Sequence, residues 1–293
     1  MKLRQVTGVL TALALGLAAS VASAADAVRF AITDISGLEM LQAEFGEFRQ
    51  VLSDATGLEF EFFPVNSRTA AVEALNAQRV DFVLTGPSEY VVMGKRAKAY
   101  PVVGFSRPDY FSAIIVMAES SYTLPSDLKG QKIALGDIGS TSNHLAPAQV
   151  LADYGVDPVH DVQMTHISRN VAWEALKRGD IAAVGMNYGK FLEIREKETA
   201  FEPGAFRVIG RGPDLPNDVL VAGAHVDKNV VETVRGAFVS HAEPLVKAIL
   251  VGKDNQKYLG MKFLPNVSDA DYNYVRSMYE TIGHPEYAEF VGN

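Results

Sequence analysis

The segment KIALGDIGSTSNHL, residues 132–145, carries more information than any other part of this 293-residue chain. Its apolar start predicts a short strand, two glycines follow in a loop, and a helix is predicted over residues 142–154. Three consecutive hydroxyl residues, Ser140, Thr141 and Ser142, lie where that helix begins. The first turn of a helix has N–H groups without acceptors and a partial positive charge, so added hydroxyl donors favour an oxyanion site. One Ser could instead merely cap the helix, but three hydroxyls exceed what a cap needs.

Strands and helices alternate on both sides of this segment. The expected strands are, in chain order, 28–32, 58–65, 80–85, 102–105, 112–117, 132–135, 162–166, 181–186, 206–209 and 219–222. Helices are expected between the first three strands, which is typical of parallel βαβ units, and again between the three strands 132–135, 162–166 and 181–186. No convincing helix separates 102–105 from 112–117, and the tail from Lys228 is mostly helical by its pattern. The chain therefore contains two α/β units and a late return to the first.

This order predicts an α/β protein of two lobes joined by a hinge, with a ligand cleft between them. We expect the first lobe to comprise residues 25–112 and 215–293, and the second lobe residues 113–214. The chain would cross between the lobes near Ser112 and Leu215. Closure of the lobes about these two crossings would bury a ligand.

The N-terminus has the pattern of a secretory signal peptide over residues 1–24. Lys2 and Arg4 form a basic start, residues 6–21 are an almost entirely apolar run, and Ala22-Ser23-Ala24 suits cleavage before the next residue. A membrane anchor is the alternative, but a run of about 16 residues is short for a bilayer that needs ~20. We expect a periplasmic or otherwise exported protein without membrane insertion after cleavage.

Composition excludes several classes of function. Lys and Arg number 27 and Asp and Glu 35, so the formal net charge is −8, which disfavours nucleic-acid binding. The chain has no cysteine, so disulfides, thiolate metal sites and cysteine nucleophiles are excluded. The six histidines show no metal-ligand spacing, and there is neither a P-loop lysine nor a Gly-x-Ser-x-Gly elbow. We therefore expect no metal, no cofactor and no enzymatic activity.

Four stretches resemble a known family. They are VDFVLTGPSEY (80–90), DLKGQKIA (127–134), the Ser-Thr-Ser sequence at 140–142 and AWEALKRGD (172–180). Together they resemble the periplasmic substrate-binding subunits of phosphonate, phosphite and phosphate-type ABC transporters, which are type II periplasmic binding proteins. The likeness covers about Val28 to Val221. The Asp-Leu-Lys-Gly phrase occurs in type II binding proteins generally, whereas the Ser-Thr-Ser phrase narrows the choice considerably.

The resemblance implies a set of ligand contacts. In the family, the hydroxyl cluster and the adjacent helix amides hold the phosphorus oxyanion, and a Tyr that matches Tyr90 contacts it. Tyr90 could instead simply pack inside the protein. The loop with Asp34 and Ser36 would face the same cleft, or would be only a solvated turn. Ser88, in the first matching stretch, and His144, two residues after the Ser-Thr-Ser sequence, complete this part of the predicted set.

Two positions depart from the family pattern. Arg169 stands by spacing where the family often has His, with His166 three residues earlier. Arg169 could clamp an oxyanion with its planar guanidinium or be an exposed helix-start cation. Asn187 replaces a frequent acidic residue, and because an amide can also donate, it better tolerates a fully ionised ligand than an aminoalkyl phosphonate. Asp218 could still supply an acceptor.

The resemblance implies a monomeric solute-binding protein that captures a phosphorus oxyanion (phosphonate, phosphite or phosphate) and delivers it to an ABC transporter permease. The alternative is an oxyanion-sensing subunit that reports to a membrane histidine kinase. The net negative charge does not oppose anion binding, since distant carboxylates are screened beyond about 8 Å at physiological salt.

Overall fold

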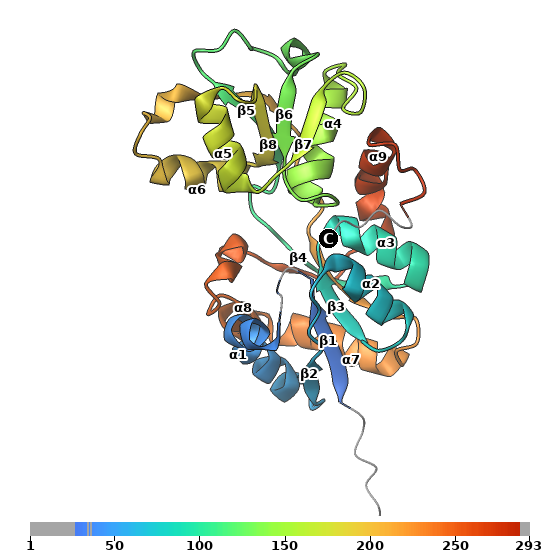
Figure 1. Ribbon diagram of the computed structural model, residues 1–293. Helices are drawn as coiled ribbons and strands as arrows, with labels where there is room; N and C mark the ends of the chain where they lie inside the picture. The colour runs from blue at the N-terminus through green and yellow to red at the C-terminus, as the bar shows by residue number, and fades with distance from the viewer. Residues whose placement is uncertain (1–26, 34, 36, 288–293) are drawn as a thin grey trace, which may run out of the picture.

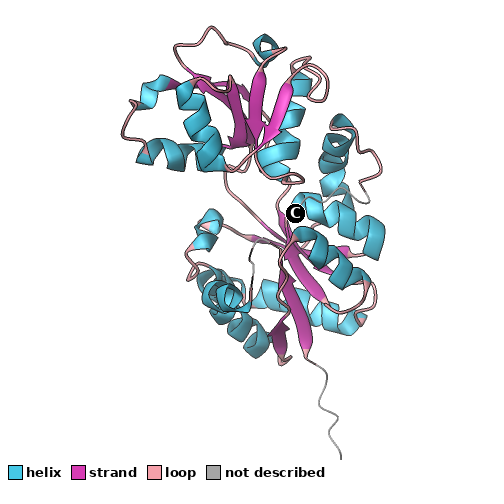
Figure 2. Ribbon diagram, in the orientation of Figure 1, coloured by secondary structure: helices cyan, strands magenta, loops and turns pink. Residues whose placement is uncertain are grey.

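The computed structural model describes residues 27–33, 35 and 37–287. The predicted signal peptide and the predicted contacts Asp34 and Ser36 lie outside the described residues. The described chain forms two lobes, each with a sheet inside and helices on its outer faces (Figures 1 and 2). The two-lobed α/β prediction is confirmed.

The first lobe is built on a six-stranded sheet in the order β11-β4-β10-β3-β1-β2. Strands β1, β2 and β3 pair in parallel, as their alternation with helices predicts, while the late strand β10 inserts antiparallel between β3 and β4. The elements of this lobe are β1 (Val28–Ile32), α1 (Leu38–Thr56), β2 (Phe60–Phe62), α2 (Arg68–Asn76), β3 (Phe82–Thr85), α3 (Pro87–Ala97), β4 (Tyr100–Phe105), β10 (Asp218–Ala222), α7 (Lys228–Ser240), α8 (Ala242–Ile249), η4 (Asp254–Tyr258), β11 (Phe263–Leu264), η5 (Asp269–Tyr272) and α9 (Asn273–Thr281).

The second lobe is built on a five-stranded sheet in the order β7-β6-β8-β5-β9. Strand β6 pairs in parallel with β7 and β8, and β5 pairs antiparallel with β8 and β9. The elements are β5 (Ser112–Met117), η1 (Pro125–Leu128), β6 (Lys132–Leu135), η2 (Thr141–Leu145), α4 (Ala146–Asp153), β7 (Gln163–His166), α5 (Arg169–Arg178), β8 (Ala183–Asn187), α6 (Tyr188–Lys197), η3 (Pro203–Ala205) and β9 (Phe206–Arg211).

Strand alternation places an apolar layer on each face of the first sheet. Phe30 and Ile32 pack on one face, whereas Ala31 between them packs on the other. Phe48 of α1 and Phe238 of α7 cover the first of these faces, with their rings 6.1 Å apart. Burying each such side chain contributes roughly 1.5–3 kcal/mol, so this layer fixes the sheet that carries one wall of the cleft.

The lobes are joined by two segments that run side by side, 106–111 and 212–217. The backbone N–H of Leu215 donates to the carbonyl of Tyr110 at 2.7 Å, and that of Arg107 donates to Oδ1 of Asn217 at 2.9 Å. Ser112, which we assigned to the first lobe, is the first residue of β5 and pairs with Asn187 in the second sheet.

Helix α9 makes a further connection between the lobes. It contacts α3 of the first lobe and α4 of the second, and the Thr281 hydroxyl donates to Oε1 of Gln149 in α4 (Figure 1). The lobes therefore touch on the side of α9.

The structure departs from the predicted elements most clearly at three places. The strand expected over 58–65 is only β2, because Pro64 has no N–H to continue the ladder. The helix expected over 142–154 begins with a π-helical turn, η2, before α4. The short strand β11 has no pattern of its own and forms by pairing with β4. Within the described residues, no helix is both long and apolar enough to cross a bilayer.

Candidate ligand-binding cleft

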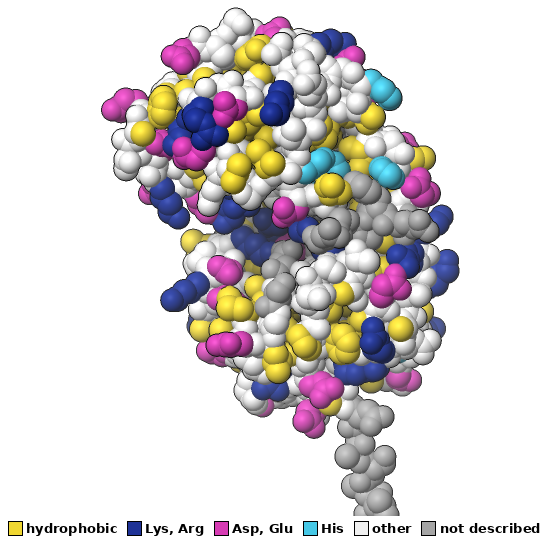
Figure 3. All heavy atoms as spheres, viewed as in Figure 1, with side chains coloured by type: hydrophobic (Ala, Val, Ile, Leu, Met, Phe, Trp, Pro, Cys, Tyr) yellow, Lys and Arg dark blue, Asp and Glu magenta, His cyan; other side chains and the backbone are white. Residues whose placement is uncertain are grey.

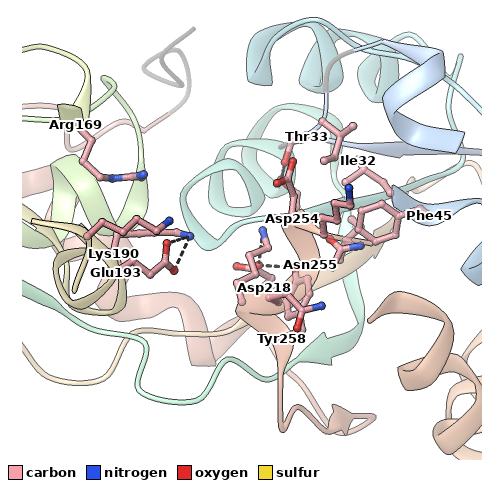
Figure 4. Close-up of a pocket in the computed structure, with 17 residues that line it drawn as sticks. Ile32, Thr33, Phe45, Arg169, Lys190, Glu193, Asp218, Asp254, Asn255 and Tyr258 are labelled. Atoms are coloured by element: carbon pink, nitrogen blue, oxygen red, sulfur yellow. Dashed lines mark hydrogen bonds and ion pairs between the residues drawn. The ribbon is translucent and has the colours of Figure 1, made fainter. Parts of the chain in front are cut away.

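The groove between the lobes consists of two adjoining chambers. The smaller has a volume of about 240 Å³ and the larger about 740 Å³. Arg169, Lys190, Asp218 and Lys257 line both chambers. Lys and Arg side chains gather in this groove on the face shown in Figure 3. Figure 4 shows Arg169 and Lys190 on one side of the larger chamber and Asp218 on the other.

The smaller chamber contains the predicted hydroxyl cluster, which we call the hydroxyl turn: Ser140, Thr141 and Ser142. The turn follows β6 and opens the π-helical turn η2, so its backbone N–H groups have no acceptor in a preceding helical turn. In the described part of the chain, no acceptor is hydrogen-bonded to the amides of Thr141, Ser142 or Asn143. Donors from the backbone and from side chains therefore meet at one end of the chamber.

Two glycines allow this loop to fold so tightly. A Cβ at Gly136 would lie 2.8 Å from the Cβ of Asn143, too close for any larger residue without a shift. Gly139 has φ of 84°, in the left-handed region that glycine tolerates best. The backbone N–H of Gly139 donates to Nδ1 of His144 at 3.0 Å, which fixes the loop from behind.

The three hydroxyl residues are buried and held in place by neighbours. The Thr141 hydroxyl donates to Oγ of Ser88 at 2.9 Å and accepts from the Ser88 backbone N–H at 3.0 Å, so it links the two lobes. Oγ of Ser140 accepts from Nδ2 of Asn143 at 3.2 Å, which leaves the Ser140 hydroxyl hydrogen directed elsewhere. The hydroxyl turn is thus preorganised, and Ser88 contributes by positioning Thr141.

Arg169 is the first residue of α5 and lines both chambers with an exposed side chain. His166, the other candidate at this place, is used by the protein, because its Nδ1–H donates to the carbonyl of Gly136 at 2.8 Å. Its ring also packs edge-on against His144, with centroids 4.6 Å apart. Of the two, Arg169 is the side chain that faces the cleft.

Asn187 lines the smaller chamber at the end of β8. Its side-chain oxygen accepts from the backbone N–H of Lys190 at 3.1 Å and so caps α6. This capping oxygen is committed to the helix, and the cationic side chain of Lys190 lies beside it in the cleft. At the position of Asn187 the chamber therefore has an amide donor and a neighbouring positive charge rather than a carboxylate.

The buried acids of the cleft are already paired. Asp218 accepts from the Tyr258 hydroxyl at 2.6 Å and lies 3.3 Å from the Arg107 guanidinium and 3.6 Å from Nζ of Lys257. Glu89 forms an ion pair with Arg68. Arg107 also stacks over the ring of Tyr110 at 3.7 Å, which orients it in the smaller chamber.

Besides Ser88, which lines neither chamber, two predicted contacts are placed elsewhere by the structure. Tyr90 is buried outside both chambers, its hydroxyl donates to Asp269 at 2.6 Å, and its ring packs against Tyr272 with centroids 4.5 Å apart. His144 is buried behind the loop, and burial, with the charges of His166 and His284, lowers its pKa to about 3. A neutral His144 suits its part as acceptor for Gly139, so it supports the hydroxyl turn rather than the ligand.

Four cations of the smaller chamber escaped the sequence analysis: Arg68, Arg107, Lys190 and Lys257. Lys190 had a usable signal, since it follows the end of the predicted strand 181–186 by four residues. Arg68 begins α2 and Lys257 lies in η4, and only the folding of distant elements brings them together.

Comparisons with known proteins identify the family and the fold. Residues 30–260 match the family model described as the periplasmic substrate-binding protein of phosphonate ABC transporters. A binding-protein component of an ABC phosphonate transporter from Pseudomonas aeruginosa is similar, with 18% identity, a TM-score of 0.65, and 89% of this chain and 87% of that chain covered.

Two further solved structures share the fold. PhnD1 from Prochlorococcus marinus, in complex with methylphosphonate, has 16% identity and a TM-score of 0.67 over 88% of this chain and 98% of that one. A Xanthomonas citri protein bound to ATP has 15% identity and a TM-score of 0.73 over 91% of this chain and 100% of that one. The matched family consists of substrate-binding proteins rather than enzymes. The chain belongs to the family of periplasmic phosphonate-binding proteins of ABC transporters.

Proposed function

We propose that this chain binds a phosphonate or closely related phosphorus oxyanion in the smaller chamber and delivers it to an ABC transporter permease. The observation that carries the proposal is the hydroxyl turn. Its three hydroxyls and the open amides of residues 141–143 meet in a chamber that cationic side chains also line. Such donors act in a partly desolvated site, where hydrogen bonds to a charged oxygen contribute about 1.5–3 kcal/mol each.

Each predicted contact that remains has a distinct part in this proposal. Ser140 and Ser142 donate to the oxyanion, and Thr141 contributes its amide while its hydroxyl stays bonded to Ser88. Arg169 approaches from the start of α5 and clamps the anion with two parallel N–H groups. Asn187 donates through its Nδ2 group, since its oxygen caps α6.

The relatives support a phosphorus ligand. The Prochlorococcus marinus protein was solved with methylphosphonate, and the match to the phosphonate family covers most of the chain. Export by a cleaved signal peptide over residues 1–24 remains part of the proposal. The sensory alternative draws no support from these relatives.

Delivery to the permease depends on closure. The two segments that run side by side between the lobes, 106–111 and 212–217, are the proposed hinges. A ligand that contacts the hydroxyl turn on one lobe and Lys257 on the other favours the closed form by its differential affinity. The closed protein is the form that we expect the permease to recognise.

The direct test is calorimetric titration of the purified protein with methylphosphonate, 2-aminoethylphosphonate, phosphite, phosphate and sulfate. We expect micromolar or tighter binding of at least one phosphorus oxyanion and weaker binding of sulfate. We also expect 2-aminoethylphosphonate to bind less tightly than methylphosphonate, because no unpaired buried carboxylate awaits its amine among the residues described here. Folded protein that binds none of these compounds would refute the proposal.

A further inference from the structure

The larger chamber has more cationic groups than the phosphonate anchor needs. Arg169, Lys197 and Lys253 line it, and we call these three residues the cationic rim. All three side chains are exposed. Among the described residues, no carboxylate lies within ion-pair distance of any of them.

The acids of the same chamber cancel only part of this charge. Asp218 is already shared by a tyrosine, an arginine and a lysine, and Glu193 forms an ion pair with Lys190 at 2.8 Å. Asp254 is the remaining acid, at the start of η4 beside Lys253. The protein as a whole carries a formal charge of −8, so a local excess of cations is a property of this cleft and not of the surface in general.

The cationic rim spans the groove from both sides. Arg169 and Lys197 belong to the second lobe, on α5 and at the end of α6, whereas Lys253 precedes η4 of the first lobe. Figure 4 shows the two sides of this chamber facing each other across open space. Closure would bring the three cations toward a common point, which is unfavourable unless an anion lies between them.

The wall of the first lobe is apolar beside these charges. Ile32, Ile35 and Phe45 are buried residues that line the larger chamber. Thr33 and Thr85 lie next to them and satisfy each other, with their hydroxyl oxygens 3.1 Å apart. A short carbon chain could lie against this wall at little cost in desolvation.

We infer that the larger chamber binds a second anionic group of the ligand, so that the substrate class is an organic phosphonate with a carboxylate or a second phosphoryl group on a short linker. This inference rests on the proposed function, since the phosphonate itself occupies the hydroxyl turn. The smaller chamber holds the first anion, the apolar wall contacts the linker, and the cationic rim binds the distal group. The two anions share Arg169, which lines both chambers.

The experiment compares ligands of matched size. Calorimetric titrations of the full exported protein use propylphosphonate, 3-phosphonopropionate and ethylenebisphosphonate. They are repeated with the Lys197→Gln/Lys253→Gln double variant. Lys228→Gln is the matched control, because Lys228 is an exposed lysine at the start of α7 that lines neither chamber.

We expect 3-phosphonopropionate or ethylenebisphosphonate to bind at least about tenfold more tightly than propylphosphonate. The double variant should bring that ratio close to one, and Lys228→Gln should keep it. Tighter binding of 3-phosphonopropionate would identify the distal group as a carboxylate, and tighter binding of ethylenebisphosphonate would identify it as a phosphoryl group.

Three results would overturn the inference. Equal affinity for propylphosphonate and for both ligands with two anionic groups would show that the rim binds no second group. If the double variant lowers the affinity for all three ligands by the same factor, the cationic rim attracts any anion and does not bind a second group. If none of the three ligands binds, and methylphosphonate does not bind either, the proposed function fails together with this inference.

Discussion

The two sides of the cleft hold their polar groups in opposite ways. The hydroxyl turn is buried, and hydrogen bonds to Ser88 and Asn143 fix it before any ligand arrives. The cationic rim is exposed, and its members have no ion-pair partner within the described chain. The hydroxyl turn loses its conformational entropy when the protein folds. The cationic rim loses the conformational entropy of its long side chains only when the ligand binds.

This difference suggests a division of labour. Preorganised donors discriminate by geometry, because a ligand that does not match them leaves buried groups unpaired. Flexible cations discriminate mainly by charge and are screened by salt. We therefore expect the hydroxyl turn to set affinity for the oxyanion and the cationic rim to adjust it.

Removal of the hydroxyls should have the largest effect. Replacing Ser140, Thr141 and Ser142 together by Ala removes at least two hydrogen bonds to a charged oxygen, so we expect affinity for methylphosphonate to fall by about 100-fold or more. Calorimetry measures the loss, and circular dichroism checks that the variant folds.

The control is Ser168→Ala, which removes an exposed hydroxyl before α5 that makes no capping bond. Thr141→Ser is the conservative partner, because it keeps the hydroxyl that meets Ser88. Micromolar binding by the triple variant would show that the oxyanion lies elsewhere.

Arg169→Ala should have the next largest effect. The exposed guanidinium loses less than a buried donor would, so we expect affinity to fall by about 30-fold. Arg169→Lys should recover only part of this, because an ammonium cannot make two parallel bonds. Calorimetry with methylphosphonate provides the measurement.

Arg178→Ala, at the other end of α5 and paired with Asp180, is the matched control and should bind normally. An Arg169→Lys variant that binds as tightly as the wild type would contradict a bidentate clamp at Arg169.

The hydroxyl turn was predictable from sequence, whereas much of its support was not. A strand, two glycines and three hydroxyls follow one another along the chain, so their geometry is local. The lock on that loop is not local: the ring of His144 faces His166, and His166 bonds the Gly136 carbonyl. Such contacts depend on the packing of β6 against β7.

Tyr90 is a residue for which the local sequence indicated the wrong role. Its position after a strand favoured a cleft role through the family resemblance, yet its hydroxyl meets Asp269, 179 residues away along the chain. No local pattern announces that the C-terminal segment returns to cover α3. Burial by that segment decided the role of Tyr90.

The cationic side of the cleft was the least predictable part. Arg169 was a candidate through its match to a family position, but Lys253 and Lys257 lie in a polar stretch far from any recognised motif. A surface lysine and a cleft lysine look alike in sequence. Only the return of the chain through β10 and η4 distinguishes them.

The pH dependence of the free energy of unfolding tests the role of His144 behind the hydroxyl turn. Its folded-state pKa is about 3 against 6.5 for the free side chain, so below pH 6.5 the unfolded chain takes up a proton that the folded protein excludes. The free energy of unfolding should therefore be highest above pH 6.5 and decline as the pH falls toward 3. Between pH 7 and 5.5 this group alone accounts for a loss of about 1.3 kcal/mol.

His144→Gln cannot take up that proton and keeps a side-chain acceptor for the Gly139 amide. We expect its urea unfolding curves to lose about 1.3 kcal/mol less than the wild type over this range. His160→Gln is the control at an exposed histidine that pairs with Asp157. An unchanged pH dependence in His144→Gln would mean that His144 is not buried as a neutral ring.

The salt dependence of affinity should distinguish the hydroxyl turn from the cationic rim, and this is the smallest of the expected effects. Raising the salt concentration screens the exposed Arg169 far more than the buried hydroxyl turn, so we expect affinity for methylphosphonate to fall only about threefold between 50 and 500 mM salt. In Arg169→Ala this dependence should weaken, whereas in Ser142→Ala it should persist unchanged at a lower affinity. Because chloride could compete for the hydroxyl turn itself, the series is run in both chloride and glutamate salts. A steep salt dependence in chloride alone would reveal that chloride competes for the hydroxyl turn. If the affinity of Arg169→Ala falls as steeply as that of the wild type in both salts, other cations of the cleft, and not Arg169, provide the attraction that salt screens.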